Sequence, residues 1–155
     1  MKGKYRFALL FLTATAAFAT QRTNFSGSWE FNAGKSQNVG MMAQMKMVQT
    51  IEQSDTALEV TSHTTFQGKD DESKTHYDLT GKPATNQTPM GGPAETMTKW
   101  QAGKLVTTWT SESAVAGGPK VVRTETRSLS GDGRTMTLES VRGSNPALVM
   151  VFEKK

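Results

Sequence analysis

The sequence predicts an all-β protein: an antiparallel up-and-down β-barrel of about eight or nine strands, with at most one short helix. Three observations predict this fold class. Polar and apolar residues alternate along most of the chain after residue 20, which is typical of half-buried strands. Clusters of Gly, Asn, Asp and Ser interrupt the alternation at short intervals, so consecutive strands are expected to form hairpins. A meander of hairpins loses its exposed edges by closing into a barrel, although a sandwich of two sheets fits the same alternation.

Residues 1–19 have the features of a secretory signal peptide. Three cations in the first six residues precede an apolar run, and Ala17-Phe18-Ala19 supplies small residues for a peptidase. We therefore expect cleavage after Ala19 and export, either to the periplasm or as a secreted protein. The apolar run is shorter than the roughly 20 residues of a membrane-spanning helix, so no integral membrane segment is expected after its removal. Residues 20–155 are then one β-barrel domain.

Charge and cysteine content exclude several classes of function. The whole chain has 18 Lys and Arg against 14 Asp and Glu, and removing the three leader cations leaves 15 against 14. Both signs are interspersed without the basic stripe of a nucleic-acid-binding surface, so no nucleic acid partner is expected. The chain has no cysteine, which excludes disulfides, thiolate zinc sites and cysteine nucleophiles. The fold must therefore be stabilised by its core alone.

The first half of the predicted barrel begins with a strand at Gly27-Ser28-Trp29. Residues 36–44 are the one candidate helix. Residues 45–52 and 58–64 alternate as strands, and the short polar stretch between them predicts a tight turn. Residues 75–79 are expected to form the next strand.

The second half is expected to contain two more hairpins and a closing strand. Residues 83–93 are rich in Pro, Gly, Thr and Asn, which predicts a mobile loop. The predicted strands beyond this loop cover residues 95–100, 104–112, 121–129, 134–141 and 148–153. Gly131 and Gly133 lie in the turn of the second hairpin, where glycine takes a positive φ at little cost.

The inward face of each strand is predicted from the position of its charges. Arg123, Glu125 and Arg127 alternate along one strand and are expected to face solvent, which turns Thr124 toward the interior. The same reasoning gives a mixed apolar and hydroxyl lining as the candidate ligand site: Met47, Val60, Tyr77, Leu79, Thr107, Trp109, Thr124, Leu138 and Met150. Because buried hydroxyl groups need partners, this lining favours a partly hydrated cavity. Threonines selected only for their strand propensity are the alternative.

The opening of the domain carries a short motif, Phe25-Ser26-Gly27-Ser28-Trp29-Glu30-Phe31-Asn32. Together with the leader, the hairpin meander and the absence of cysteine, it resembles the lipocalin/fatty-acid-binding-protein (calycin) superfamily. The chain is most similar to uncharacterised secreted bacterial lipocalin-like proteins, in which segments like residues 35–36, 100–106 and 129–134 recur.

This resemblance implies a ligand-holding barrel. One end would be closed by Gly27 and Trp29, with a late arginine, Arg142 or Arg127, packed on the tryptophan. Fatty-acid-binding relatives hold a carboxylate with an Arg-x-Tyr triplet near the C-terminus, and residues 148–155 lack that triplet. The comparison therefore favours a neutral or amphipathic ligand.

Methionines are concentrated at Met41, Met42, Met45 and Met47. Thioethers are soft ligands for Cu(I) or Ag(I), so a periplasmic metal site completed by His63, His76 or a tryptophan is a lesser alternative function. Methionine also suits a flexible flap over the mouth of a barrel, and this interpretation is preferred. No metal or cofactor is expected.

Catalysis finds little support in the sequence. His76 and Asp78 share one strand face, but the chain has no Gly-x-Ser-x-Gly nucleophile motif. Residues 70–72 are acidic, are expected in a solvated turn, and lack the spacing of a calcium loop. We therefore expect a protein that is not an enzyme.

The sequence thus favours an exported binding protein that holds a small hydrophobic or amphipathic molecule inside a β-barrel. The alternative is a filled barrel that acts through its surface as a secreted interaction or inhibitor protein. An internal void opening between residues 41–47 and 83–93 would favour the binding protein, and a close-packed interior would favour the alternative. The oligomeric state is left open by the sequence.

Overall fold

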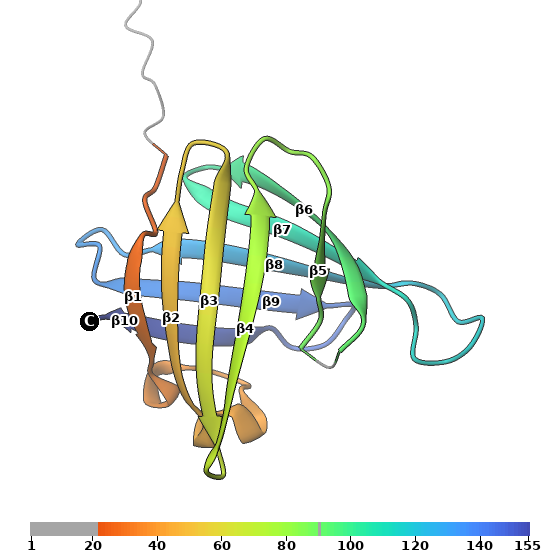
Figure 1. The fold of residues 1–155 in the computed structure, drawn as a ribbon, viewed down its shortest axis with the longest axis horizontal. Helices are drawn as coiled ribbons and strands as arrows, with labels where there is room; N and C mark the ends of the chain where they lie inside the picture. Colours follow the sequence, from red (N-terminus) through yellow and green to blue (C-terminus); the bar gives the residue numbers. More distant parts are fainter. Residues whose placement is uncertain (1–21, 90) are drawn as a thin grey trace, which may run out of the picture.

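Ten antiparallel strands form one sheet in the computed structural model, which describes residues 22–89 and 91–155 (Figure 1). The predicted leader lies outside these residues. The strands are β1 (Gly27–Phe31), β2 (Lys46–Gln53), β3 (Ala57–Phe66), β4 (Lys69–Asp78), β5 (Ala84–Gln87), β6 (Pro93–Gln101), β7 (Lys104–Ser111), β8 (Val121–Leu129), β9 (Thr135–Arg142) and β10 (Leu148–Lys154). Two short 3₁₀ helices, η1 (Ala33–Lys35) and η2 (Gly40–Gln44), join β1 to β2.

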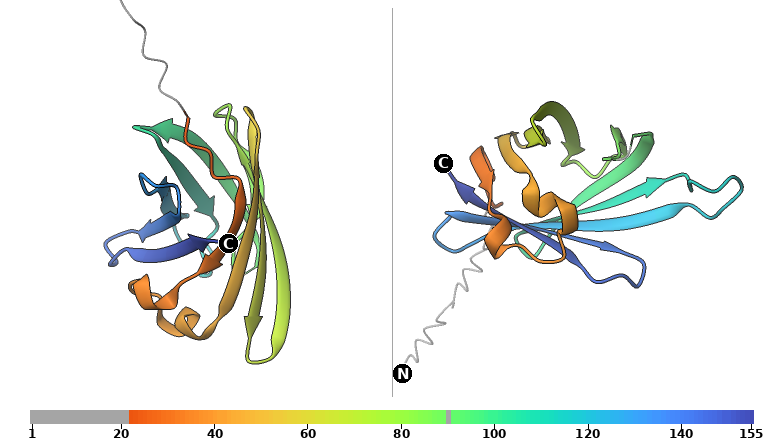
Figure 2. Two further views of the ribbon diagram at one scale, coloured as in Figure 1. Left: turned by 90° about the vertical axis from the view of Figure 1, so that its left-hand side faces the viewer. Right: turned by 90° about the horizontal axis from the view of Figure 1, so that it is seen from below.

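The sheet is a meander whose first strand pairs with its last. Neighbouring strands follow the order β4-β3-β2-β1-β10-β9-β8-β7-β6-β5, and every pairing is antiparallel. Trp29 lies opposite Lys154, and Phe31 lies opposite Phe152. The sheet curves into a nearly closed barrel, with β2 to β4 on one side and β6 to β9 on the other (Figure 2). The expected up-and-down barrel is therefore confirmed.

The number of strands is ten rather than the predicted eight or nine. The additional strand is β5, which lies within residues 83–93, predicted to be a loop. This strand has only four residues and pairs with β6 alone. The strand conformation of β5 therefore depends on pairing with β6 more than on the composition of its four residues.

Two local predictions were also wrong. The candidate helix at residues 36–44 is reduced to η2, because Gly40 takes a positive φ of 54° and interrupts regular helical geometry. Residues 70–72 are not a turn but part of β4, directly opposite residues 63–65 of β3. The turn itself is confined to Gln67 and Gly68, both of which have positive φ.

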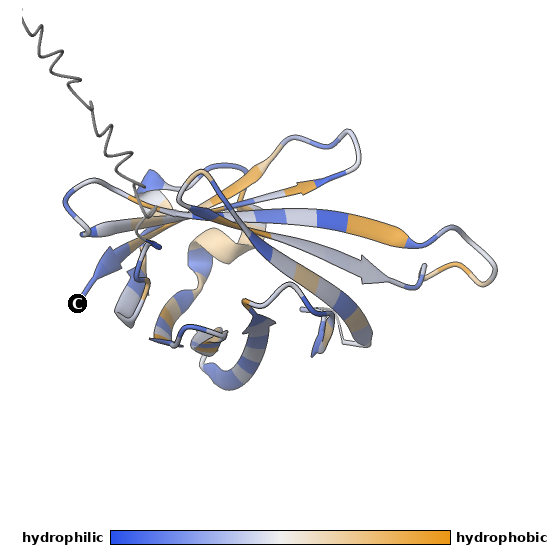
Figure 3. Ribbon diagram, turned by 90° about the horizontal axis from the view of Figure 1, so that it is seen from above, coloured by the Kyte–Doolittle hydropathy of each residue, from blue (hydrophilic) through white to orange (hydrophobic). Residues whose placement is uncertain are grey.

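The core occupies the inside of the barrel and is rich in aromatic side chains. Its buried apolar members are Phe25, Trp29, Phe31, Ile51, Leu58, Val60, Tyr77, Leu79, Ala94, Leu105, Trp109, Met136, Leu138 and Phe152. Phe25 stacks on Trp100 with ring centroids 6.1 Å apart, and Phe31 packs on Phe152 at 5.7 Å. Hydropathy alternates along several strands, as expected when one face meets the core and the other meets solvent (Figure 3). Among the described residues, no helix is long and apolar enough to cross a membrane.

Candidate functional site in the barrel interior

Charged side chains of β8 point into the barrel, opposite to the face predicted from the sequence. Glu125 and Arg127 are 8% and 3% exposed. Arg127 lies opposite Leu105 of β7 and Leu138 of β9, both buried, and residues directly opposite in a ladder share a face. Thr124 is adjacent to Glu125 in the strand, so it lies on the outer face and not in the interior.

The first part of this charged cluster surrounds Glu125. Trp109 donates a hydrogen bond from Nε1 to Glu125 Oε2 at 2.8 Å, and Arg123 Nη2 lies 3.1 Å from Oε1. The Arg123 guanidinium also lies 4.6 Å from the centre of the Trp109 ring system. The carboxylate is thus compensated by one cation and one indole N–H. Arg123 Nε is buried and has no hydrogen-bond partner among the described residues.

The second part is Arg127, whose charge is not matched by a carboxylate. Its Nη1 donates to Gln49 Oε1 at 3.3 Å and contacts the Met136 sulfur at 3.2 Å. The guanidinium carbon lies 5.8 Å from the centre of the Tyr77 ring. Within the described part of the chain, no carboxylate oxygen lies within 4.0 Å of Arg127. The interior therefore holds a nearly inaccessible cation with amide, thioether and aromatic neighbours.

Tyr77 connects the two parts. Its ring meets Trp109 edge-on, with centroids 6.2 Å apart and planes at 82°. Burial raises the pKa of the Tyr77 phenol, and the nearby Glu125 carboxylate raises it further, while Arg127 opposes both effects. Tyr77 is accordingly a neutral hydroxyl at any physiological pH, able to donate or accept a hydrogen bond.

The other predicted lining residues are found as follows. Val60, Leu79, Thr107, Trp109 and Leu138 are buried in the core. The Thr107 and Thr98 hydroxyl groups lie 3.0 Å apart and satisfy one another. Met47 and Met150 are half-buried and pack against the same core. A role in ligand contact stays a prediction for all of them.

Sequence reasoning missed Gln49 and assigned Arg123, Glu125 and Arg127 to the outer face. A signal for them existed in the hairpin register. Leu138 of β9 was expected to be inside, and the register pairs Leu138 with Arg127. An inward Leu138 therefore requires an inward Arg127.

Gly27, Trp29 and Lys154 lie together where β1 pairs with β10. Trp29 is fully buried and donates from Nε1 to the Phe25 carbonyl at 2.9 Å. The cation over its ring is Lys154, with Nζ 5.4 Å from the centre, and a Cβ on Gly27 would lie 3.2 Å from Lys154 Cε. Gly27 and Trp29 thus lie together as the resemblance implies, but with a lysine from the strand opposite.

Arg142 does not pack on Trp29, whereas Arg127 bonds to Gln49, the residue opposite Trp29 in β2. Arg142 is exposed and lies opposite Arg123 at the far end of β9. The Lys154 N–H donates to the Arg134 carbonyl. Arg142 comes eight residues after Arg134, which is roughly 26 Å along a strand, so Arg142 lies far from Lys154. The direct ladder partner of Trp29, Lys154, supplies the positive charge.

Met47, the last residue of the methionine-rich segment, lies on the opposite sheet face from His63. Met41 is 73% exposed. Met47 lies opposite Thr64 on the inner face, whereas His63 is the next residue along β3 and faces outward, paired with Glu72. In the described part of the chain, no group of three or more His, Cys, Asp or Glu side chains is arranged to hold a metal ion.

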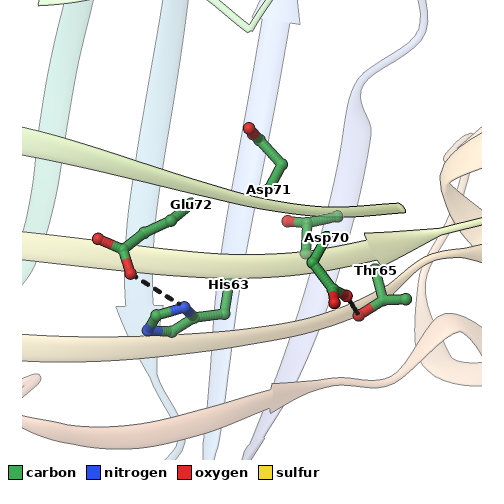
Figure 4. Close-up of a pocket in the computed structure, with 6 residues that line it drawn as sticks. His63, Thr65, Asp70, Asp71 and Glu72 are labelled. Carbon is green, nitrogen blue, oxygen red and sulfur yellow. Dashed lines mark hydrogen bonds and ion pairs between the residues drawn. The ribbon is translucent and has the colours of Figure 1, made fainter. Parts of the chain in front are cut away.

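Hollows on the described surface include the following two. One, of about 380 Å³, lies at the turn end of β3 and β4 and is lined by His63, Thr64, Thr65, Asp70, Asp71 and Glu72 (Figure 4). The other lies beside η1 and the paired ends of β1 and β10. Neither is lined by residues 41–47 or 83–93, between which an opening was expected.

No protein-family model matches the sequence. No curated protein matches it either. Solved structures do match the fold. Fatty-acid-binding protein 1 of Echinococcus granulosus aligns with a TM-score of 0.66 and 14% identity over 84% of this chain and 96% of that one. The apo form of lipid binding protein 8 of Caenorhabditis elegans gives a TM-score of 0.66 and 13% identity over 84% and 95%.

A fatty acid transporter designated REP1-NXSQ is similar to the same degree. Its TM-score is 0.64 at 14% identity, covering 84% of this chain and 95% of the transporter. The likeness confirms that the chain has the β-barrel fold found in fatty-acid-binding proteins. The nearer similarity to secreted bacterial lipocalin-like proteins stays a prediction.

Proposed function

We propose that the protein is a non-catalytic binding protein that holds a small amphipathic molecule, with an apolar chain and an anionic end, inside the barrel. The observation that carries the proposal is Arg127, a cation that is 3% exposed and has no carboxylate partner within the described residues. A charge removed from water is costly unless it is paired and hydrogen-bonded. The anionic group of a ligand would supply the missing partner, with Gln49 and Tyr77 beside it as neutral hydrogen-bonding groups.

The rest of the ligand would bind through apolar contact. The core side chains around Arg127 include Leu138, Met136 and Leu105, and half-buried Met150 and Met47 extend the apolar surface. Removing apolar surface from water contributes roughly 25 cal/mol per Å². The structural neighbours are named as fatty-acid-binding and lipid-binding proteins and a fatty acid transporter, so a fatty acid is the first ligand to test.

The absence of catalysis is part of the same proposal. Both histidines of the chain lie on the exposed outer face of β3 and β4, where His63 pairs with Glu72 and His76 pairs with Glu59. These cross-strand pairs are directed away from the charged interior. Export with cleavage after Ala19 is likewise proposed, on the composition of the leader.

A filled barrel that acts through its surface is the second candidate. It is favoured by the aromatic core, whose side chains occupy the inside of the barrel. The two hollows described above also favour it, because most of the residues that line them do not belong to the core. Under this hypothesis the charged cluster serves only to specify the fold.

Arg127→Met tests the proposal, with Arg142→Met as a matched control that removes an exposed arginine. Palmitic acid and hexadecanol are the ligands, since they share a hydrocarbon chain and differ in the anionic end. We expect the unmodified protein to bind palmitate, and Arg127→Met to weaken that binding by roughly tenfold to a hundredfold, the value of a charged hydrogen bond. Hexadecanol affinity should change little, and Arg142→Met should leave both affinities unchanged. Isothermal titration calorimetry measures all four.

The stability of the same variants separates the two candidates. Without ligand, Arg127→Met should unfold at a temperature equal to or higher than the unmodified protein, because an apolar side chain replaces a costly buried charge. If neither ligand binds and Arg127→Met unfolds at a lower temperature, the arginine is structural and the filled barrel is correct.

A further inference from the structure

The barrel has one seam, between β4 and β5. These strands are the two ends of the ten-stranded sheet, and no ladder of backbone hydrogen bonds joins them. They nevertheless lie side by side, and β4 also lies near β6 (Figure 1). The seam is therefore the line along which the barrel is closed without strand pairing.

Among the described residues, one side chain forms hydrogen bonds across this seam. Asn86 of β5 accepts a hydrogen bond from the His76 N–H of β4 at 2.9 Å and donates one to the His76 carbonyl at 2.8 Å. Its Nδ2 also donates to Thr96 Oγ1 of β6 at 2.8 Å. The side-chain amide thus takes the place of a neighbouring strand for one residue. Asn86 is 7% exposed, so these bonds are shielded from water.

The geometry of β4 explains why His76 is the residue held. In an antiparallel edge strand, alternate residues direct both backbone groups away from the paired strand. The His76 side chain is itself held outside the barrel by Glu59 of β3. Along the rest of β4, toward Lys69, the residues are exposed apart from half-buried Thr75.

The seam lies over the charged cluster. Thr96, which Asn86 holds, is directly opposite Trp109 in the β6–β7 ladder. Trp109 in turn donates to Glu125. Opening the Asn86 contacts would therefore expose the interior at Trp109, next to Tyr77 and the arginines of β8.

We propose that the β4–β5 seam is the passage by which small molecules reach the barrel interior, and that Asn86 is the residue that holds it closed. Everywhere else in the barrel wall, a passage would require breaking a backbone ladder of several hydrogen bonds. At the seam it requires releasing one side chain. Use of this passage by a fatty acid rests on the proposed function, whereas the opening itself does not.

Asn86→Ala tests the passage, with Gln87→Ala as a matched control on the same strand, where the side chain is exposed. Amide hydrogen exchange by NMR reports the closed seam, because the His76 N–H is held only by Asn86 Oδ1. We expect protection of the His76 amide to fall roughly tenfold or more in Asn86→Ala, since each hydrogen bond is worth several-fold in an equilibrium constant. Gln87→Ala should leave it unchanged.

A neutral soluble nitroxide reports whether the interior becomes accessible. The three tryptophans are labelled with fluorine and resolved by ¹⁹F NMR, with Trp109 assigned by a Trp109→Phe variant. In Asn86→Ala we expect several-fold greater broadening of the Trp109 signal, while the signal of the fully buried Trp29 keeps its width. If Asn86→Ala does not fold, Thr96→Val should give the same changes in smaller measure, because it removes the hydroxyl that accepts from Asn86 and donates to the Ala84 carbonyl.

The outcomes are distinct. Loss of His76 protection together with Trp109 broadening supports the passage. Unchanged protection, or lost protection with Trp109 as inaccessible as before, overturns it. If palmitate binds, its association and dissociation should both be faster in Asn86→Ala with little change in affinity, and unchanged rates would also overturn the passage. If palmitate binds to no variant, the proposed function fails while the nitroxide result still decides the passage.

Discussion

Gly27 shows how a single residue determines the local packing around Trp29. Its φ of 136° is a conformation that side chains with a Cβ rarely adopt. The Lys154 side chain crosses directly over it to reach the Trp29 ring. The spacing of glycine two residues before tryptophan therefore has a local physical cause, because the backbone must turn and leave room at the position next to the indole.

Gly27→Ala is expected to lower the free energy of unfolding by about 1–3 kcal/mol, the cost of one residue held in a strained backbone conformation. Chemical denaturation measures it. Gly131→Ala is the control, because Gly131 has nothing within 4 Å of an added Cβ and no positive φ. Adding Lys154→Ala to Gly27→Ala should not restore stability. Restoration would show that the Lys154 contact, and not the backbone, is the constraint.

The buried arginines show where residue-by-residue reasoning is insufficient. Alternation along β8 predicts correctly that Arg123, Glu125 and Arg127 share one face, but charge alone predicts the wrong face. Their burial is possible because partners arrive from other strands: Trp109 from β7 and Gln49 from β2. Gln49 is 78 residues distant in sequence, so no local pattern indicates it.

At the scale of elements, the turn between β8 and β9 fixes the register that places these charges. Asp132 accepts hydrogen bonds from Ser130 Oγ at 2.6 Å and from the Arg134 N–H at 3.0 Å. The Ser130 hydroxyl, followed by the Arg134 amide, lowers the pKa of the Asp132 carboxyl. A one-residue slip here would turn every side chain of the hairpin to the other face.

Asp132→Ala is expected to lower the melting temperature near neutral pH, and the loss should shrink in acid. A carboxyl group with a lowered folded-state pKa stabilises the protein above its unfolded pKa of about 3.9, and this contribution disappears as the pH falls through the folded value. Melting temperatures of both proteins across the acid range measure it. Asp55→Ala, in the β2–β3 turn, is the control. A difference that stays constant down to the lowest pH would contradict the role of the charged carboxylate.

The elements that the sequence predicted well are those with long alternation, such as β2, β7, β8 and β9. β5 was missed because four residues among Pro, Gly and Asn carry no periodic signal. Its central residue, Asn86, disfavours strands by propensity, yet its side-chain amide is what the seam requires. The predicted strand at residues 75–79 was shorter than β4 for a related reason. The charged first half of β4 has the composition of a turn, and only its pairing with β3 makes it a strand.

At the scale of the whole molecule, the first and last strands of the chain pair with each other and join the two halves of the sheet. β1 and β10 pair directly, and η1 contacts β10 through Asn32 and Lys35, which both bond to Glu153. Lys35 and then Asn32 lower the pKa of the Glu153 carboxyl. The strand that follows the predicted leader is thus an integral part of the barrel.

Export is a prediction at this scale. Expressed in a bacterial host with its first 19 residues, the chain should be recovered from the periplasm beginning at Thr20, as measured by intact mass spectrometry. Replacing Ala17 and Ala19 with large residues should leave the precursor uncleaved. Recovery of the full-length chain from the cytoplasm would contradict the prediction.

The sequence by itself determined the fold class, the hairpin meander and the position of glycine beside tryptophan in the first strand, because these depend on local alternation, turns and short motifs. Only the tertiary structure decided which face of β8 is inside, that β5 is a strand, and that Lys154 covers Trp29. The physical reason is common to all three. A buried charge, a short strand and a cation over a ring are each stable only when a partner from a distant segment is in place, and closure of the barrel brings those segments together.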